Sequence, residues 1–310
     1  MTVELMTPSR RKRRANRSRP IWEEEPTRVG QAGKNLLIGA LVLAVLFPMW
    51  CVLITSLSSR RTINEAGGMV VVPRGIDFSA YLTIFQGGQV TRAVWVSTLV
   101  TVVGTLVSLG LTVFAAYGLS RTGSLWHRPL LFVFLLTFLI YPGLVPSYLV
   151  VTGLGMKDSL WALILPTAIN AFNLVIIRAF FMNIPGELID SARIDGAGEF
   201  RILWKIVLPL SKAIIAVVGL FYAVGYWNTY FNAVLYIDSN DKWPIQRLLQ
   251  AYILAGQAPS VQTGGGGTAY PPDIAIKMAV VMVTVVPALI VYPFVQRHFT
   301  KGVILGAVKG

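Results

Sequence analysis

Six long apolar segments limit what this chain can fold into more than any other feature. They lie at residues 36–57, 93–119, 129–151, 159–181, 210–236 and 275–296. A helix needs roughly 20 apolar residues to cross the hydrocarbon core of a membrane, and each segment meets that length. Only 13% of the residues are charged, about half the fraction typical of a soluble domain. We therefore expect an all-α polytopic membrane domain with six transmembrane helices at residues 36–296, between a basic disordered tail (1–35) and a short C-terminal tail (297–310).

The distribution of charge predicts which side of the membrane the loops occupy. The chain carries 27 Lys and Arg residues against 14 acidic ones, a net charge of +13. Most basic residues lie in the two tails, in the loop after the second apolar segment, and around the loop between the fourth and fifth. Because Lys and Arg accumulate on the cytoplasmic side, both termini are expected in the cytoplasm of a cell-membrane protein. The basic tail is then a topology anchor beside the lipid bilayer, and nucleic acid is not an expected partner.

The sequence lacks the residue patterns of an enzyme or a metalloprotein. Cys51 is the single cysteine, and it lies inside the first apolar segment, so neither a disulfide nor a Cys/His metal site is predicted. No G-x-x-x-x-G-K-[ST] phosphate loop occurs, because the run Gly264–Gly267 continues as Thr268-Ala269-Tyr270 without a lysine. We therefore expect no catalytic residues, no metal and no cofactor bound by this chain.

A polar segment at residues 183–209 separates the fourth and fifth apolar segments. Pro185 suits the first turn of a helix, and Glu187 and Asp190 then lie near the positive end of its dipole. The sequence Asp195-Gly196-Ala197-Gly198 interrupts the pattern, since glycine adopts positive φ readily. A second short helix carries large apolar residues at helical spacing: Phe200, Leu203, Trp204 and Val207. We expect Phe200, Leu203 and Trp204 to lie on one exposed apolar face of this helix. The segment therefore predicts a knob of two short helices around a glycine turn.

The spacing within this segment also carries a family resemblance. It follows D-x-A-x-x-x-G-x9-I-x-L-P from Asp190 to Pro209. This pattern resembles the EAA loop of ABC-importer permeases, which docks on the ATPase subunit, with Asp190 in place of the usual Glu. An amphipathic loop lying on the bilayer would share the apolar periodicity but not this register. The six spans and the ending from Thr300 to Gly310 are similar to carbohydrate-uptake permeases of the maltose type, and Tyr236–Gln246 is similar to permeases for complex plant or algal oligosaccharides.

The resemblance implies a type I ABC importer permease that forms half of a transport pathway for oligosaccharides. Its implied partners are a second homologous permease subunit, two ATPase subunits that bind ATP with Mg, and an extracellular solute-binding protein. The residues implied in coupling to the ATPase are Glu187, Asp190, Ser191, Ala192, Asp195, Gly196, Ala197, Phe200, Leu203 and Trp204.

Aromatic and amide side chains at membrane depth are the candidates for a sugar path. Tyr226, Trp227 and Asn228 lie in the fifth span, and Asn170 and Asn173 lie in the fourth. Aromatic faces stack on sugar rings and amides bind hydroxyls, while polar groups at this depth often mark a pathway. The alternative is that these residues form hydrogen bonds between helices and an aromatic belt at the membrane surface. The sequence leaves both interpretations open.

The loop at residues 237–274 is too long for a simple connection between spans, and loops of this length are often functional. Residues 245–254 read as a helix within it, and the loop is expected on the outer side, facing the binding protein. The competing functional hypothesis is an ion-gradient-driven secondary transporter of small polar solutes. Such proteins usually carry membrane-embedded carboxylates, whereas the acidic residues here lie in tails, loops or span margins. A membrane-embedded enzyme is disfavoured by the missing catalytic residues.

Overall fold

The computed structural model describes residues 27–86, 88–121, 123, 126–140, 142–254 and 273–307, and every regular element in these ranges is a helix. The chain divides into two compact units, Met1–Trp50 and Cys51–Gly310. In the first unit, the described residues form most of α2 (Arg28–Ser56), which contains Pro48. The predicted basic tail falls mainly on residues 1–26, which lie outside the described part of the chain.

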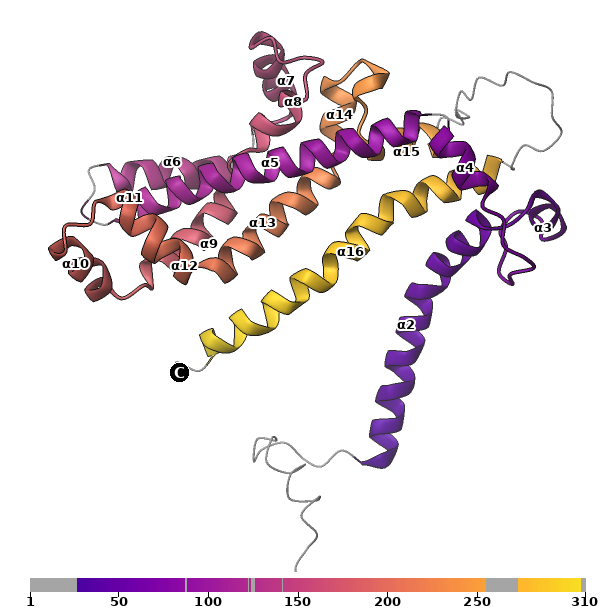
Figure 1. The fold of residues 1–310 in the computed structure, drawn as a ribbon, viewed down its shortest axis with the longest axis horizontal. Coiled ribbons are helices and arrows are strands. Elements are labelled where there is room, and N and C mark those ends of the chain that lie inside the picture. Colours follow the sequence, from indigo (N-terminus) through magenta and orange to yellow (C-terminus); the bar gives the residue numbers. More distant parts are fainter. Residues whose placement is uncertain are drawn as a thin grey trace, which may run out of the picture. The chain divides into compact units, whose positions relative to one another are not determined.

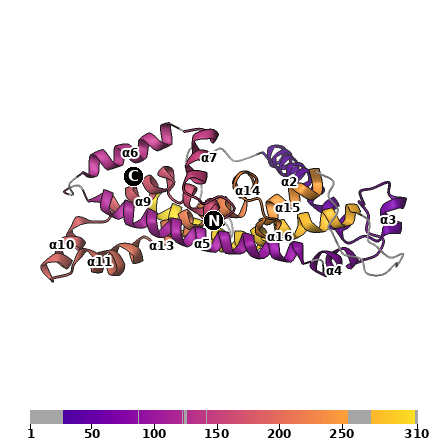
Figure 2. The same ribbon diagram turned by 90° about the horizontal axis from the view of Figure 1, so that it is seen from above.

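The second unit is a set of long helices joined by short ones (Figure 1). The long helix α5 packs against α9 and α13, and α13 packs against α16. Figures 1 and 2 place α10 and α11 at one end of α5 and α15 toward the other. The elements of this unit are α3 (Arg60–Glu65), α4 (Ser79–Gln86), α5 (Gln89–Ser120), α6 (His127–Leu139), α7 (Leu144–Gly153), α8 (Trp161–Ile164), η2 (Leu165–Thr167), α9 (Ala171–Met182), α10 (Gly186–Ile194), α11 (Glu199–Ile202), the π-helical turn η3 (Leu203–Val207), α12 (Leu208–Leu210), α13 (Lys212–Trp227), α14 (Phe231–Tyr236), η4 (Asn240–Lys242), α15 (Ile245–Leu254) and α16 (Asp273–Ala307).

Within the described residues, three helices are long and apolar enough to cross a membrane, and the number rises to six if each bent helix pair is one span. The bend between residues 161–167 and α9 is 53°, and it follows Pro166. Proline removes a backbone hydrogen bond and disfavours a straight helix, so Pro166 is a local cause for a bend in the fourth apolar segment. The prediction of an all-helical, six-span chain is confirmed.

Several helix ends differ from the sequence-based boundaries. α2 begins at Arg28, inside the segment predicted as tail, because no proline lies between Pro26 and the apolar run and the helix accommodates the intervening Gly30 and Gly33. α16 continues to Ala307, so most of the predicted C-terminal tail is helical. The predicted fifth span, 210–236, is not one helix: α13 ends at Trp227, and α14 follows separately. Hydropathy alone could not find this break, since apolar residues continue on both sides of it.

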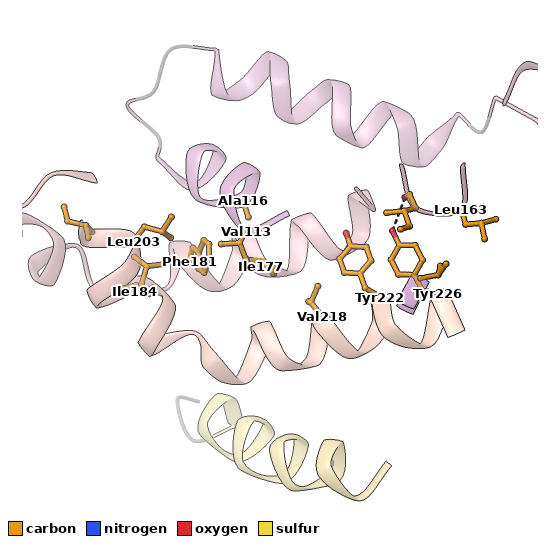
Figure 3. Packing of buried hydrophobic residues seen from close by; sticks show 14 of the residues in the cluster. Val113, Ala116, Leu163, Ile177, Phe181, Ile184, Leu203, Val218, Tyr222 and Tyr226 are labelled. Carbon is orange, nitrogen blue, oxygen red and sulfur yellow. Dashed lines mark hydrogen bonds between the residues drawn. The ribbon is translucent and has the colours of Figure 1, made fainter. Parts of the chain in front are cut away.

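The main apolar core of the second unit joins α5, α9, α13 and the segment of short helices between the last two (Figure 3). Val113, Ile177, Leu203 and Val218 are among its buried members. A close approach within it is at Gly104, where an added Cβ atom would lie 2.9 Å from the Tyr226 ring. Glycine is therefore required at this position for α5 and α13 to pack as they do.

A second core lies where α4, α5, α15 and α16 meet. Ile84, Val90, Leu248 and Ala279 are buried in it. The helix predicted at residues 245–254 is present as α15, and Leu248 supplies part of its buried face. The predicted loop 237–274 is therefore helical in part, and its residues 255–272, including Gly264–Gly267, lie outside the described residues.

Candidate functional site

The first helix of the knob (residues 185–207) ends in a hydrogen-bonded glycine cap. The Gly196 backbone N–H donates to the Arg193 carbonyl at 3.0 Å, and the Ala197 N–H donates to the Ala192 carbonyl at 2.9 Å. Gly196 has φ +78°, the left-handed conformation that this cap requires. Ala192 and Ala197, which this cap brings together, both pack against the main core. The alanines and the glycine of the sequence pattern therefore have a direct structural role.

The second helix of the knob turns one face into the core. Ile202, Leu203 and Val207 are buried there, beside Phe181 and Ile184 at the end of the preceding span. Leu203 was predicted on the exposed apolar face, and this placement is wrong, because only 2% of its surface is exposed. The π-helical turn from Leu203 widens the helix at this point. A strict helical spacing drawn from the sequence does not follow such a turn.

The other face of the knob exposes large apolar side chains. Phe200 is 69% exposed and Trp204 is 58% exposed, as predicted from their spacing. Ile194, at the end of α10, is 86% exposed, and Leu188 also reaches the surface. The sequence analysis missed these two residues, although their position between charged neighbours in a polar segment was a usable signal. We refer to these four exposed side chains, Leu188, Ile194, Phe200 and Trp204, as the apolar face of the knob.

Glu199 connects the knob to α5. Its Oε1 atom accepts hydrogen bonds from Arg193 at 2.8 and 3.2 Å, which joins α11 to α10. Its Oε2 atom accepts a hydrogen bond of 2.5 Å from the Tyr117 hydroxyl, which belongs to α5. The Arg121 guanidinium stacks over the Tyr117 ring at 4.5 Å and lies 3.9 Å from the same Oε2 atom. Both oxygens of one carboxylate are therefore engaged, each by a different helix.

The environment of Glu199 favours its charged form. The Tyr117 hydrogen bond, and then the guanidinium of Arg193, hold the pKa of this carboxyl below its usual range. A cavity of about 590 Å³ lies alongside, lined by Tyr117, Arg121, Arg193 and Glu199 together with Gly118, Ser120 and Gly123. Glu199 was not among the predicted coupling residues, since a single charge on a surface loop is usually a solvated one.

The remaining predicted coupling residues are polar and exposed. Asp190 lies 3.5 Å from the Arg193 guanidinium, an exposed pair within α10. The Ser191 hydroxyl donates to the Glu187 carbonyl at 2.7 Å, which is a bond within the helix. Asp195 is the C-cap residue of α10. Glu187, Ser191 and Asp195 are therefore available on the surface of the knob rather than committed to its interior.

The structure separates the five predicted sugar-path residues into buried and exposed ones. Tyr226 is buried, and its hydroxyl forms a 2.6 Å hydrogen bond with Ser108 of α5 and donates to the Ile164 carbonyl at 3.1 Å. Its neighbour Tyr222 bonds Thr112 of α5 at 2.7 Å in the same manner. Asn173 is also buried. Both tyrosine hydroxyls therefore form hydrogen bonds between helices, which is the alternative to a sugar contact that the sequence left open.

Asn170 and Asn228 are the exposed members of this predicted set. The Asn170 side chain caps α9 by accepting from the Asn173 backbone N–H at 3.2 Å. Asn228 follows α13 at the break before α14; its side-chain amide donates to Val224, and its oxygen lies 3.4 Å from the Gln246 amide. Trp227 is partly buried and donates to the Thr284 carbonyl of α16 at 3.1 Å.

A polar brace holds residues 237–254, at the far end of α5 from the knob. The Asp158 carboxylate accepts hydrogen bonds from the backbone N–H groups of Asp238 and Ser239 at 3.0 and 2.9 Å. It also accepts from the Ser239 hydroxyl at 2.6 Å and the Lys242 ammonium at 2.8 Å. These donors, Lys242 first, hold the pKa of Asp158 far below its usual range. The turn before α8 is thereby fixed to the segment after α14.

Further polar contacts tie the 237–254 segment to the spans. The Ile245 backbone N–H donates to the Ser97 hydroxyl of α5 at 2.8 Å. Arg247 donates to the carbonyls of Ala233 and Ile237, and its guanidinium stacks 4.3 Å from the Trp243 ring. The part of the predicted outer loop that the structure describes is therefore an ordered segment tied to its neighbours by polar contacts.

Comparison with known proteins identifies this arrangement. The family of inner membrane components of binding-protein-dependent transport systems matches residues 108–305. The polygalacturonan/rhamnogalacturonan transport system permease protein YtcP of Bacillus subtilis (strain 168) is 46% identical over 286 residues, covering 89% of this chain and 100% of that protein. A chain in the crystal structure of a bacterial ABC transporter that imports the acidic polysaccharide alginate matches with a TM-score of 0.84 and 29% identity, covering 90% of this chain and 100% of that one.

A second solved structure shares the fold alone. It is a bacterial alginate ABC transporter in complex with an alginate pentasaccharide-bound periplasmic protein, and its chain matches with a TM-score of 0.58 and 16% identity over 86% of this chain and 93% of that one.

Among the described residues, no group of three or more His, Cys, Asp or Glu side chains could hold a metal ion. The family match covers most of the chain, including the knob and the 237–254 segment. The chain therefore belongs to the binding-protein-dependent ABC permeases, as the non-catalytic inner-membrane component of an importer.

Proposed function

We propose that this permease forms half of the translocation pathway of an ATP-driven importer of acidic oligosaccharides, and that the knob couples it to a separate ATPase. The complex would contain a second homologous permease, two ATPase subunits that bind ATP with Mg, and an extracellular solute-binding protein. The observation that carries the coupling role is the uncovered apolar face of the knob, with Ile194 86% exposed and Phe200 69% exposed. Large exposed apolar groups beside charged ones mark a surface that another protein covers.

The knob is suited to pass force into the membrane domain. Its buried face, with Ile202 and Val207, belongs to the same core as Ile177 of α9 and Val218 of α13. Protein cores are close-packed, so a displacement at the base of the knob moves these spans rather than being absorbed by empty space. A partner that binds the apolar face can therefore move α9 and α13 together with the knob as a rigid unit.

The class of cargo rests on the relatives. YtcP is named for polygalacturonan and rhamnogalacturonan, and the solved transporter is described as importing alginate. All three polymers carry carboxylate groups on their sugar rings. The sequence supports a carbohydrate cargo through the amide side chains near the break after α13, and we propose Asn228, with Gln246 beside it, as a contact for sugar hydroxyls.

The other predicted path residues fit less direct roles in this proposal. Tyr226 and Asn173 are buried and would meet a sugar only after α5 and α13 separate. Trp227 and Asn170 lie at the margins of the same region, bonded to α16 and to the start of α9. We propose that they shape the path while Asn228 contacts the cargo. The charge distribution of the sequence supports cytoplasmic termini and a cytoplasmic knob.

Reconstitution of the complete transporter tests this proposal. The permease, its partner permease, the ATPase and the binding protein are incorporated in liposomes, and uptake of labelled galacturonate oligosaccharides is measured with and without ATP. We expect uptake that requires ATP and the binding protein and exceeds that of a neutral glucan of equal length. Uptake driven by an ion gradient without ATP would refute the proposed mechanism. Equal uptake of the neutral glucan would refute the acidic cargo but leave the ATP-driven mechanism intact.

A further inference from the structure

The action of the knob depends on which helices it moves. The chain connects it directly to α9 on one side and to α13 on the other, through Ile184 and Leu208. α5 is distant in sequence, yet its end lies against the knob (Figure 1). The contacts between them are of two kinds, one apolar and one polar.

The apolar contact joins aromatic rings. The centroid of the Phe200 ring lies 6.0 Å from that of Phe114 on α5, with the rings tilted by 43°. Phe114 is itself 46% exposed, so this contact is at the surface and leaves most of Phe200 free for a partner. Such a pair contributes directional packing but does not lock one geometry.

The polar contact is more specific. The Tyr117 hydroxyl lies 2.5 Å from Oε2 of Glu199 and 3.2 Å from the carbonyl oxygen of the same residue. Hydrogen bonds to ionised acceptors are shorter and roughly twice as strong as neutral ones. Arg193 holds Oε1 from the other side, so the carboxylate cannot rotate away without losing both partners. The Arg178 guanidinium, which donates to the Leu119 carbonyl at 2.9 Å, fixes the same end of α5 to α9.

We propose that Glu199 is a positioning residue that clamps the knob to α5 through Tyr117, so that ATP-driven movement of the knob is transmitted fully to α5 as well as to α9 and α13. This inference rests on the proposed coupling function of the knob. Without the clamp, the knob remains connected to α9 and α13 by the chain, still shares the main apolar core with α5, and keeps its apolar face. ATP hydrolysis then continues, but part of each movement is no longer transmitted to α5, which carries the Ser108 and Thr112 contacts to α13.

The sharpest variant is Tyr117→Phe, because it removes the bond to α5 and leaves the Arg193–Glu199 pair within the knob intact. In the reconstituted transporter, Tyr117→Phe should lower the oligosaccharide imported per ATP hydrolysed by roughly three- to tenfold, in line with the net loss of one intramolecular hydrogen bond. The ATPase should remain bound in a detergent pull-down, since the apolar face is unchanged. Hydrogen exchange should speed up at the amides of α11.

Tyr81→Phe is the matched control. The Tyr81 hydroxyl forms a side-chain hydrogen bond of 2.8 Å with Ser56, far from the knob along the chain. Tyr81→Phe should leave unchanged both the transport ratio, which is the oligosaccharide imported per ATP hydrolysed, and the hydrogen exchange of α11. Glu199→Gln keeps an acceptor for Tyr117 but loses the charge, so its transport ratio should fall between those of Tyr117→Phe and the unmodified chain.

Two results would overturn the clamp. One is an unchanged transport ratio in Tyr117→Phe, and the other is release of the ATPase by the same change, which would make Tyr117 part of the docking surface. A non-additive effect in the Tyr117→Phe, Glu199→Gln double variant should confirm that the two residues act through each other. If the unmodified complex shows no ATP-dependent import at all, the proposed function fails before the clamp is tested.

Discussion

The knob and the 237–254 segment are both polar interruptions between apolar spans. They differ in how far their apolar side chains are exposed and their polar groups paired. The knob exposes four large apolar residues, Leu188, Ile194, Phe200 and Trp204, and its polar contacts to α5 meet at one residue, Glu199. Among the described side chains of the 237–254 segment, Ile253 is the large apolar one that is exposed. Polar groups of that segment are bonded to Asp158, Ser97 and backbone carbonyls.

This difference indicates different kinds of dependence on partners. A segment whose polar groups are mostly paired and whose apolar groups are mostly buried keeps its shape alone. A segment with an uncovered apolar face gains stability when another protein covers it, because about 25 cal/mol is recovered per Å² of apolar surface buried. Variants of the knob should therefore affect assembly and transport, whereas variants of the 237–254 segment should first affect the stability of this chain.

The largest effect should come from Gly196→Pro, which should abolish oligosaccharide uptake. Gly196 has φ +78°, and proline fixes φ near −65°, so the glycine cap that ends α10 cannot form. Uptake by reconstituted complexes is the measurement. Gly198→Pro is the matched control, because Gly198 has φ −69° and a Cβ atom added there would have no other atom within 4 Å. Near-normal uptake in Gly196→Pro would show that the turn does not position the knob.

The second prediction compares apolar with charged groups on the knob. Ile194→Ala and Phe200→Ala should each weaken retention of the ATPase, since burying a large apolar side chain is worth about 1.5–3 kcal/mol and 1.4 kcal/mol is roughly a tenfold change in affinity. Asp190→Asn should have a smaller effect, because its pair with Arg193 is exposed and such pairs contribute about 0–1 kcal/mol. The readout is ATPase retained per permease in a detergent pull-down.

Ile253→Ala on the 237–254 segment is the control for position. It removes a similar exposed side chain, 45% exposed, from the other end of the molecule and should leave ATPase retention unchanged. If Asp190→Asn releases the ATPase while both apolar variants retain it, docking is electrostatic and the contrast between the two regions must be explained differently.

The sequence predicted the knob well because its signals are local. Pro185, the glycine turn and the polar composition between two apolar runs depend only on neighbouring residues. The first helix begins and ends as expected, and the second begins as expected. The burial of Leu203 was not predictable in this way, since it follows from a π-helical turn and from packing against Phe181. The local sequence pattern predicted the helices but not which face of each helix is buried in the core.

Contacts between distant parts of the chain were missed for the same reason. Tyr117 and Glu199 are separated by 82 residues, and Asp158 and Lys242 by 84. A tyrosine at the end of a span and an aspartate in a turn carry no sign of these partners in one sequence. Tyr226 shows the same limit: its type and depth fitted both a sugar contact and an interhelical bond, and only the structure shows that its hydroxyl bonds to Ser108 and the Ile164 carbonyl.

The third prediction tests the core that links the two ends. Gly104→Ala should destabilise the chain by about 1–3 kcal/mol, because overpacking a close helix contact forces a shift and the new Cβ would lie 2.9 Å from the Tyr226 ring. Gly110→Ala on the same helix has no atom within 4 Å of the added Cβ and is the control. Thermal unfolding of the purified permease is the measurement. Equal stability of the two variants would mean that α5 and α13 are not closely packed at Gly104.

The smallest effect should be that of Asp158→Asn, which weakens the brace on the 237–254 segment. The pKa of Asp158 is lowered, chiefly by Lys242, so its charged form contributes stability above the usual carboxyl pKa of about 3.9, and that contribution is lost as the pH falls through the lowered value. Asparagine still accepts from the Ser239 backbone but offers Lys242 no full charge. The Tm of the Asp158→Asn variant should be roughly 2–4 °C below that of the unmodified chain at pH 7. This difference in Tm should narrow as the pH is taken below the usual carboxyl pKa. Asp238→Asn, which breaks the more exposed pair with Lys157, should change the Tm less. A gap for Asp158→Asn that stays constant with pH, or a loss of ATPase retention in the same variant, would remove the distinction between a self-sufficient segment and a partner-dependent knob.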